Sequence, residues 1–296
     1  MGKIIEDFLK ASDEAKTGNR EPLKTWINTV LGETWDETGL QLDAHELMKR
    51  AEEYGAEVPD GVIALTCGVD TQDNRFEYEI VGWGLGKESW GIEKGEIYGN
   101  MLEKDIWERL DNVLLRIFTK VDGTQMTITA TCIDSQGHYT NQVDRFCLPR
   151  WGRNIWSIKG QGGMDVPFIS NPAKNNRVKV EKFTLGVDTG KVLVYDRLKV
   201  EKPGAGYCHF PEGRGYDENY FRGLTAEKKI ITYKKGRATV AWVLKNQGFR
   251  RNEPLDLRNY ATAAVEIAHL ALDPVEKKPK ARKQRRTRKS GIGGEA

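Results

Sequence analysis

An apolar run that ends in a single carboxylate constrains this chain more than any other feature. Residues 62–69 read Val-Ile-Ala-Leu-Thr-Cys-Gly-Val and are followed by Asp70 and two polar residues. A run this rich in β-branched residues predicts a buried strand. The pattern recurs at residues 126–136, where Asp134 follows the apolar run. Because a buried carboxylate is costly unless it is compensated, each Asp predicts a metal, Arg or backbone donor beside it.

The composition is that of a globular protein without a membrane segment. Of the 296 residues, 39% are hydrophobic and 30% are charged, as in ordinary soluble domains. No apolar run approaches the ~20 residues that a bilayer span needs, and the N-terminus lacks the apolar centre of a signal peptide. The four cysteines are scattered without zinc-like spacing, which disfavours structural zinc. These observations favour a cytoplasmic protein.

The central part of the chain alternates predicted strands and helices in the order β-β-β-α-β-α-β. Turn signals separate the first three strands and predict an antiparallel meander. The later elements predict parallel strands, and so a mixed α/β sheet with helices on its faces. Since crossovers are right-handed, the first strand can lie beside the fourth, which would place Asp70 next to Asp134. The predicted strands are 62–70, 75–84, 88–97, 126–133 and 155–159, with helices at 105–115 and 140–148.

Further helices are predicted on both sides of this region. In the late helix, Asp256, Tyr260 and Ala263 share a face, which can bring Asp256 against the sheet. Asp43 is a plausible N-cap for an earlier helix that runs to Tyr54. The predicted helices are an amphipathic lead-in within residues 1–24, then 43–54, 188–199 and 252–268.

The C-terminal end is strongly basic. Residues 277–296 hold nine Lys/Arg and one Glu, so that residues 1–276 carry a formal charge of −5 within the total of +3. Such a segment is expected to be disordered and to contact a polyanion with a steep salt dependence. Its basic residues are Lys277, Lys278, Lys280, Arg282, Lys283, Arg285, Arg286, Arg288 and Lys289. Four further basic residues near the predicted cleft could contact phosphates: Lys159, Lys174, Arg177 and Lys179. The alternative is that they are ordinary solvated surface residues.

Carboxylates at the tips of neighbouring strands can hold a pair of Mg²⁺ or Mn²⁺ ions, which prefer hard oxygen ligands. Two ions roughly 4 Å apart activate a water and stabilise the leaving oxygen in phosphodiester hydrolysis. Asp also caps turns after strands, so the pattern of Asp70, Asp134 and Asp256 leaves both interpretations open. His138 could approach the metals or a phosphate, or could simply cap the next helix. Motifs of serine hydrolases, zinc proteases and P-loop ATPases are absent from the sequence.

Six short segments of the sequence form a set of motifs, which are residues 22–35, 66–72, 82–84, 133–137, 251–256 and 260–261. Together they cover roughly residues 20–275. This set resembles the large terminase subunits of lambda-type tailed bacteriophages. In that family an N-terminal packaging ATPase precedes a nuclease domain with a ribonuclease H-like fold.

The resemblance implies a DNA endonuclease that cuts concatemeric phage DNA during genome packaging and uses two Mg²⁺ or Mn²⁺ ions. Carried over by motif, Asp70 and Asp134 match the acids on the first and fourth strands. Asp256 matches the third acid, with Glu253 as its substitute. The P-loop half of the family pattern is absent from this sequence, so ATP-driven translocation is not expected of it. The chain would be an excised domain or a split-gene product.

The resemblance also implies a domain order and a set of partners. Residues 1–58 would be a helical linker from the ATPase region, 59–275 the ribonuclease H-like domain and 276–296 the basic tail. The implied partners are double-stranded DNA, the terminase ATPase domain, the small terminase subunit and the portal or procapsid, in the host bacterial cytoplasm and without a membrane. Two alternatives stay open: a resolvase- or transposase-type nuclease of the same fold, and a non-catalytic module that binds DNA or portal.

Overall fold

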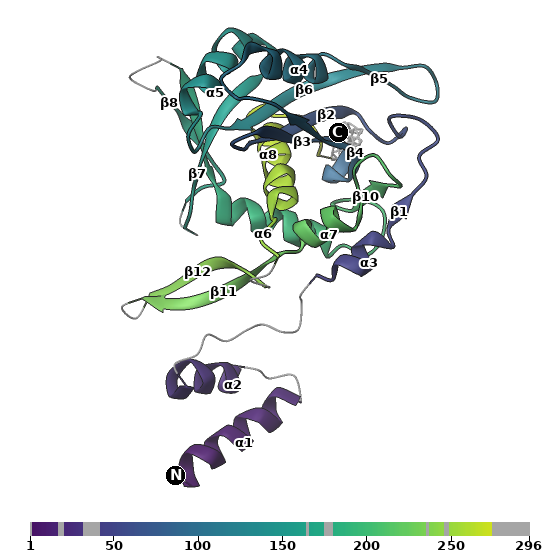
Figure 1. The fold of residues 1–296 in the computed structure, drawn as a ribbon. Coiled ribbons are helices and arrows are strands. Elements are labelled where there is room, and N and C mark those ends of the chain that lie inside the picture. The colour runs from purple at the N-terminus through teal and green to yellow at the C-terminus, as the bar shows by residue number, and fades with distance from the viewer. Residues whose placement is uncertain are drawn as a thin grey trace, which may run out of the picture.

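A mixed β-sheet of ten strands forms the centre of the computed structural model, which describes residues 2–16, 21–31, 42–163, 166–174, 180–234, 237–245 and 249–273 (Figure 1). The strand order is β1-β10-β4-β3-β2-β6-β7-β9-β8, and β5 pairs with β6. The strands are β1 Ala51–Glu52, β2 Ala64–Thr71, β3 Arg75–Trp83, β4 Ser89–Tyr98, β5 Ile117–Thr119, β6 Gln125–Asp134, β7 Ile155–Gln161, β8 Ile169–Lys174, β9 Glu181–Gly186 and β10 Cys208–Pro211.

The predicted fold class is confirmed by the pairing of these strands. β2, β3 and β4 form the antiparallel meander, and β6 and β7 continue the sheet in parallel from β2. The first strand of the meander therefore lies beside the fourth strand, as in the ribonuclease H-like architecture that the resemblance implies. A separate antiparallel ribbon consists of β11 Glu227–Lys234 and β12 Arg237–Leu244.

Helices cover both faces of the sheet (Figure 1). Buried side chains of α4 and α5 join the cluster of apolar residues on one face, and those of α8 pack on the other face. α6 packs against α8 on its outer side, where Gly190 lies beside Asn259. The helices are α1 Gly2–Lys16, α2 Glu21–Trp26, α3 Ala44–Met48, α4 Lys104–Leu114, α5 Thr140–Cys147, α6 Val187–Leu198, α7 Glu218–Leu224 and α8 Glu253–Ile267.

Strand alternation decides which side chains of β2 meet α8. Leu65, Cys67 and Val69 belong to the apolar cluster under α4 and α5, so the alternate residues Gly68 and Asp70 face α8. A Cβ on Gly68 would lie 2.1 Å from the carbonyl oxygen of Leu257. The absence of a side chain at Gly68 therefore allows α8 to cross the sheet in direct backbone contact with β2.

One predicted helix is shorter than expected. Asp43 caps α3 as predicted, because its Oδ1 accepts hydrogen bonds from the backbone N–H groups of His45 and Glu46 at 2.8 and 3.1 Å. The helix ends at Met48 rather than at Tyr54, because Ala51–Glu52 pair in parallel with the end of β10. A strand of two residues is too short to leave a periodic signal in the sequence.

The remaining predicted helices agree with the structure to within a few residues. α6 and α8 occupy the predicted 188–199 and 252–268 segments. No helix among the described residues is long and apolar enough to cross a membrane. The basic tail, together with Arg177 and Lys179, lies outside the residues that the structure describes.

Candidate active site

Asp70 and Asp134 lie at the adjoining ends of β2 and β6. The two strands run parallel with Val69 paired to Ile133, so the two Asp residues occupy neighbouring positions. The Thr71 hydroxyl donates a 2.8 Å hydrogen bond to the backbone carbonyl oxygen of Asp134, which joins the two strand ends. Each Asp is 8% exposed. The predicted pairing of these two strands, which makes Asp70 and Asp134 neighbours at one edge of the sheet, is confirmed.

Both carboxylates are buried, and neither forms an ion pair with a Lys or Arg among the described residues. Burial raises the pKa of Asp70 to about 7, and repulsion from Asp134 adds to this rise although the Gln72 amide donates a hydrogen bond to Asp70 Oδ2. Burial likewise raises the pKa of Asp134 to about 6, with repulsion from Asp256 acting in the same direction. The backbone N–H of Gln136 donates a 3.2 Å hydrogen bond to Asp134 Oδ1. Two desolvated carboxylates that repel each other would be stabilised by a divalent cation.

Asp256 reaches the same region from the first turn of α8, as its helical spacing predicts. Lys191 Nζ from α6 lies 3.1 Å from Asp256 Oδ1 and 2.7 Å from Glu227 Oε2. The Asn252 side-chain amide donates to Asp256 Oδ2 at 3.0 Å and to Glu227 Oε1 at 2.8 Å. Burial raises the pKa of Asp256, while the Lys191 ammonium opposes this rise. Asp256 therefore differs from Asp70 and Asp134, because a buried cation already neutralises it.

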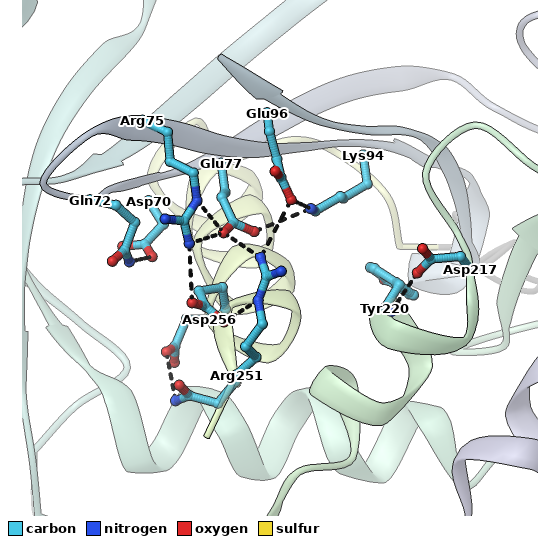
Figure 2. Close-up of polar contacts among 12 residues, drawn as sticks. Asp70, Gln72, Arg75, Glu77, Lys94, Glu96, Asp217, Tyr220, Arg251 and Asp256 are labelled. Carbon is cyan, nitrogen blue, oxygen red and sulfur yellow. Dashed lines mark hydrogen bonds and ion pairs between the residues drawn. The ribbon is translucent and has the colours of Figure 1, made fainter. Parts of the chain in front are cut away.

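A second cluster of charges, absent from the sequence-based predictions, adjoins Asp70. Glu77 on β3 is the cross-strand partner of Asp70, and Glu96 on β4 is the partner of Glu77. Three cations surround the fully buried Glu77 carboxylate, as Figure 2 shows. They are Arg75 at 2.6 Å, Lys94 at 3.2 Å and Arg251 at 2.7 Å.

The sequence does carry one signal for this cluster. Residues 75–79 read Arg-Phe-Glu-Tyr-Glu, so two Glu residues alternate with aromatic residues in a predicted core strand. Phe76 and Tyr78 pack under α4, and the two Glu residues consequently face α8. The side-chain alternation of residues 75–79, combined with the register of the hairpin that they form with residues 64–71, would have placed Glu77 beside Asp70.

Glu253, the substitute third acid, lies between the two clusters. Its carboxylate is 3.6 Å from Arg75 Nη2 and 3.7 Å from Arg251 Nε. Its Oε2 atom is buried and accepts no hydrogen bond from the described residues. Repulsion from Glu253 also contributes, after burial and the other acids, to the raised pKa of Asp70.

The donor set fits a hard divalent cation. It consists of the carboxylates of Asp70 and Asp134, which are buried and form no ion pair among the described residues, and of Glu253, whose Oε2 atom has no hydrogen-bond donor among them. Within the described ranges, no three His, Cys, Asp or Glu side chains stand close enough together to hold one ion.

The other predicted site residues either lie apart from the carboxylates or have side chains outside what the structure describes. His138 is 81% exposed, and its Nδ1 atom lies 3.0 Å from Asp73 Oδ1. Lys159 is exposed near the end of β7. The backbone of Lys174 ends β8, and its side chain falls outside what the structure describes. Among the described side chains, neither His138 nor Lys159 contacts Asp70, Asp134 or Asp256.

Comparisons with known proteins point to one family. The family model described as "Terminase large subunit gpA, endonuclease domain" matches residues 1–279. The chain is 34% identical over 272 residues to the large terminase subunit of Escherichia phage lambda, and 33% identical over 273 residues to that of Enterobacteria phage P21. Each alignment covers 90% of this chain and 41% of the relative, so the chain spans about two fifths of the length of these relatives.

One solved structure is also similar. It is a mutant nuclease domain of the large terminase subunit gp2 of bacterial virus Sf6 with manganese. The alignment covers 74% of this chain and 93% of that one, with 14% sequence identity and a TM-score of 0.40.

Proposed function

This chain belongs to the family of the endonuclease domain of the terminase large subunit gpA, and from that premise we propose that it is a metal-dependent DNA endonuclease. Its substrate would be the concatemeric double-stranded DNA that a phage packages. The observation that carries the proposal is the pair of buried carboxylates of Asp70 and Asp134 on adjoining parallel strands, neither of which forms an ion pair among the described residues.

Asp70, Asp134 and Asp256 would hold two Mg²⁺ or Mn²⁺ ions in this enzyme, with Glu253 as the substitute for Asp256. When bound, such ions supply an activated water and stabilise the oxygen that leaves the phosphorus. The raised pKa values of Asp70 and Asp134 come first from burial and then from repulsion between the acids, and bound cations would oppose both effects.

The surrounding residues of the chain hold these acids in place. The Gln72 amide and the backbone N–H of Gln136 orient Asp70 and Asp134 by hydrogen bonds. Lys191 and Asn252 fix both oxygens of Asp256. Because β2, β6 and α8 are core elements, the site is built on a rigid frame, which suits a reaction that depends on ion position.

Plasmid cleavage tests the proposal. The full chain is incubated with supercoiled DNA and either Mn²⁺ or Mg²⁺, and nicked and linear products are measured over time. EDTA should abolish cutting. Asp70→Asn and Asp134→Asn should each lower the rate by at least about 100-fold, since even partners outside the ligand set cost 10–100-fold.

A matched control distinguishes the loss of an active-site carboxylate from a general loss of negative charge. Asp105 is 74% exposed on α4, on the opposite face of the sheet from α8. Asp105→Asn should cut at the wild-type rate. If Asp70→Asn and Asp134→Asn also cut at that rate, the assignment of the active site is wrong.

The family supports a role in genome packaging, in which the chain works with an ATPase domain, a small terminase subunit and a portal. These partners, the division of the chain at residues 58 and 275, and the bacterial cytoplasm as its location are part of the same proposal.

A further inference from the structure

One buried ammonium contacts two carboxylates beside the candidate active site. Lys191 Nζ lies 2.7 Å from Glu227 Oε2 and 3.1 Å from Asp256 Oδ1. The three residues come from α6, from the first residue of β11 and from the first turn of α8, which meet at this point (Figure 1). Asp256 therefore shares its cation with a second acid, which the sequence-based predictions did not include.

The Asn252 side chain joins the same two acids. Its amide nitrogen donates a 2.8 Å hydrogen bond to Glu227 Oε1 and a 3.0 Å hydrogen bond to Asp256 Oδ2. Glu227 and Asp256 are thus linked by one ammonium and one amide, and both oxygens of each carboxylate are contacted. Because a carboxylate has about four acceptor positions, Asp256 keeps the capacity to bind a metal ion.

Glu227 is anchored independently of Asp256. Its backbone carbonyl oxygen accepts a hydrogen bond from the Tyr195 hydroxyl, and the residue pairs with Leu244 in the β11–β12 ladder. The side chains of Lys191 and Glu227 are 9% and 10% exposed, whereas that of Asp256 is 21% exposed. Asp256 is therefore the most accessible of the three charged groups to a ligand.

The charges of these three side chains do not cancel. Two carboxylates and one ammonium leave a formal charge of −1. Without the Glu227 carboxylate, Lys191 would have Asp256 as its sole ion-pair partner among the described residues, and the formal charge would be zero. With Glu227 present, Lys191 has a closer partner, so Asp256 can bind a metal without leaving a buried ammonium unpaired, which would be costly.

We propose that Glu227 is a positioning residue of the nuclease, which holds Lys191 so that Asp256 can bind a divalent cation. This inference rests on the proposed function for the role of Asp256 as a metal ligand. It adds an acid that lies outside the motifs of the family resemblance. Glu227 acts through Lys191 and needs no contact of its own with the ion.

Binding of Mn²⁺ in the absence of DNA tests this role in the full chain. Free Mn²⁺ gives an electron paramagnetic resonance signal that is lost when the ion binds protein, so a titration measures Kd independently of cleavage. Asp256→Asn identifies the site concerned, because it removes the ligand itself. Glu227→Gln should weaken binding at that site by about 10–100-fold, the usual cost of losing a residue that supports a metal ligand.

A double variant distinguishes the effect of charge from that of packing. In Lys191→Met/Glu227→Gln no ammonium competes for Asp256, and the formal charge of the three positions is again −1. Mn²⁺ binding should therefore recover to within about 3-fold of wild type, although the double variant loses more native contacts than the single one. Binding as weak as that of Glu227→Gln would overturn the proposal, as would wild-type binding by Glu227→Gln.

Glu266→Gln is the matched control on the same helix. Glu266 forms a 2.6 Å ion pair with Lys87, and it lies ten residues beyond Asp256 in α8, about 15 Å along the axis. This variant should bind Mn²⁺ like wild type, and a loss equal to that of Glu227→Gln would overturn the proposal. Neither test variant leaves a buried ammonium unpaired, so both should fold, which thermal melting verifies.

Failure of the nuclease is a separate outcome. If the wild type binds Mn²⁺ at a site sensitive to Asp256→Asn and Glu227→Gln but does not cut DNA, the proposed enzyme is rejected and the role of Glu227 in metal binding is retained. If cleavage depends on Asp70 as expected while Glu227→Gln binds Mn²⁺ like wild type, the nuclease is retained and the role of Glu227 is rejected.

Discussion

Asp70 and Glu77 are direct cross-strand partners in the β2–β3 ladder, yet their charges are compensated in different ways. Arg75, Lys94 and Arg251 all contact the buried Glu77 carboxylate. Among the described residues no cation forms an ion pair with Asp70, and burial raises its pKa to about 7. Glu77 is therefore a structural group whose charge is neutralised, whereas the charge of Asp70 is not neutralised by any described residue. This difference supports a metal-binding role for Asp70 rather than for Glu77.

The third metal ligand can be identified by comparing two conservative variants. We expect Asp256→Asn to raise the Mn²⁺ concentration that gives half-maximal cleavage by at least about 10-fold, and Glu253→Gln to raise it less. The reason is that Asp256 contributes more than Glu253 to the raised pKa of Asp70, and it also raises the pKa of Asp134. The measurement is cleavage rate across an Mn²⁺ titration. A larger effect of Glu253→Gln would make Glu253 the ligand.

The paired aspartates could be predicted because two local rules determine their placement. The apolar runs identify β2 and β6, and the right-handed crossover rule places these strands together, so that Asp70 and Asp134 follow as neighbours. Asp256 was identified from helical spacing and the family resemblance together.

The rest of the site depends on contacts between residues far apart in the sequence. Lys191 lies on α6, and its contact with Asp256 is set by the packing of α6 against α8, for which the sequence has no periodic signal. The three cations around Glu77 likewise come from β3, β4 and the approach to α8. In the fold, the β1–β10 pair joins Ala51 to Phe210, a pairing that local sequence patterns do not record.

Gly68 should be intolerant of a side chain. Its Cβ would lie 2.1 Å from Leu257 O and 2.8 Å from Ala261 N, so Gly68→Ala must push α8 away from β2. We expect the free energy of unfolding to fall by about 1–3 kcal/mol, the usual cost of overpacking. Cleavage should also decline because Asp256 moves with the helix. Chemical denaturation measures the first effect. Gly152→Ala should change the stability by less than about 0.5 kcal/mol, because apart from the adjoining residues no described atom lies within 4 Å of the new Cβ.

Asp111 should make stability depend on pH at the acidic end. Burial alone would raise its pKa, but hydrogen bonds from Arg150 and Arg153, at 2.8 and 2.7 Å, outweigh burial and lower it. A lowered folded-state pKa means that this stabilisation is full above the unfolded value of about 3.9 and is lost as the pH falls below it. Asp111→Asn should therefore be less stable than wild type at pH 7, on the order of 1 kcal/mol. This difference should shrink toward zero in melting curves at lower pH; a difference independent of pH would contradict the account.

Glu79 and Arg258 form a buried ion pair that fixes α8 against β3. Arg258 Nη2 lies 2.6 Å from Glu79 Oε1, which also accepts hydrogen bonds from Tyr216 and Tyr220 at 3.0 and 2.8 Å. The two charged side chains are 0% and 2% exposed. Removal of one partner leaves a buried charge uncompensated, so Glu79→Gln and Arg258→Met should each lower the free energy of unfolding by about 3–5 kcal/mol.

The double variant Glu79→Gln/Arg258→Met decides whether this cost comes from the pair. With both charges removed, no buried ion is left unpaired, and the loss of stability should be clearly smaller than the sum of the two single losses. Denaturant unfolding of all four proteins gives the coupling energy. Additive losses would mean that each residue acts through packing alone. The exposed pair of Lys104 and Glu108, treated in the same way, should show no measurable coupling, because solvent screens it.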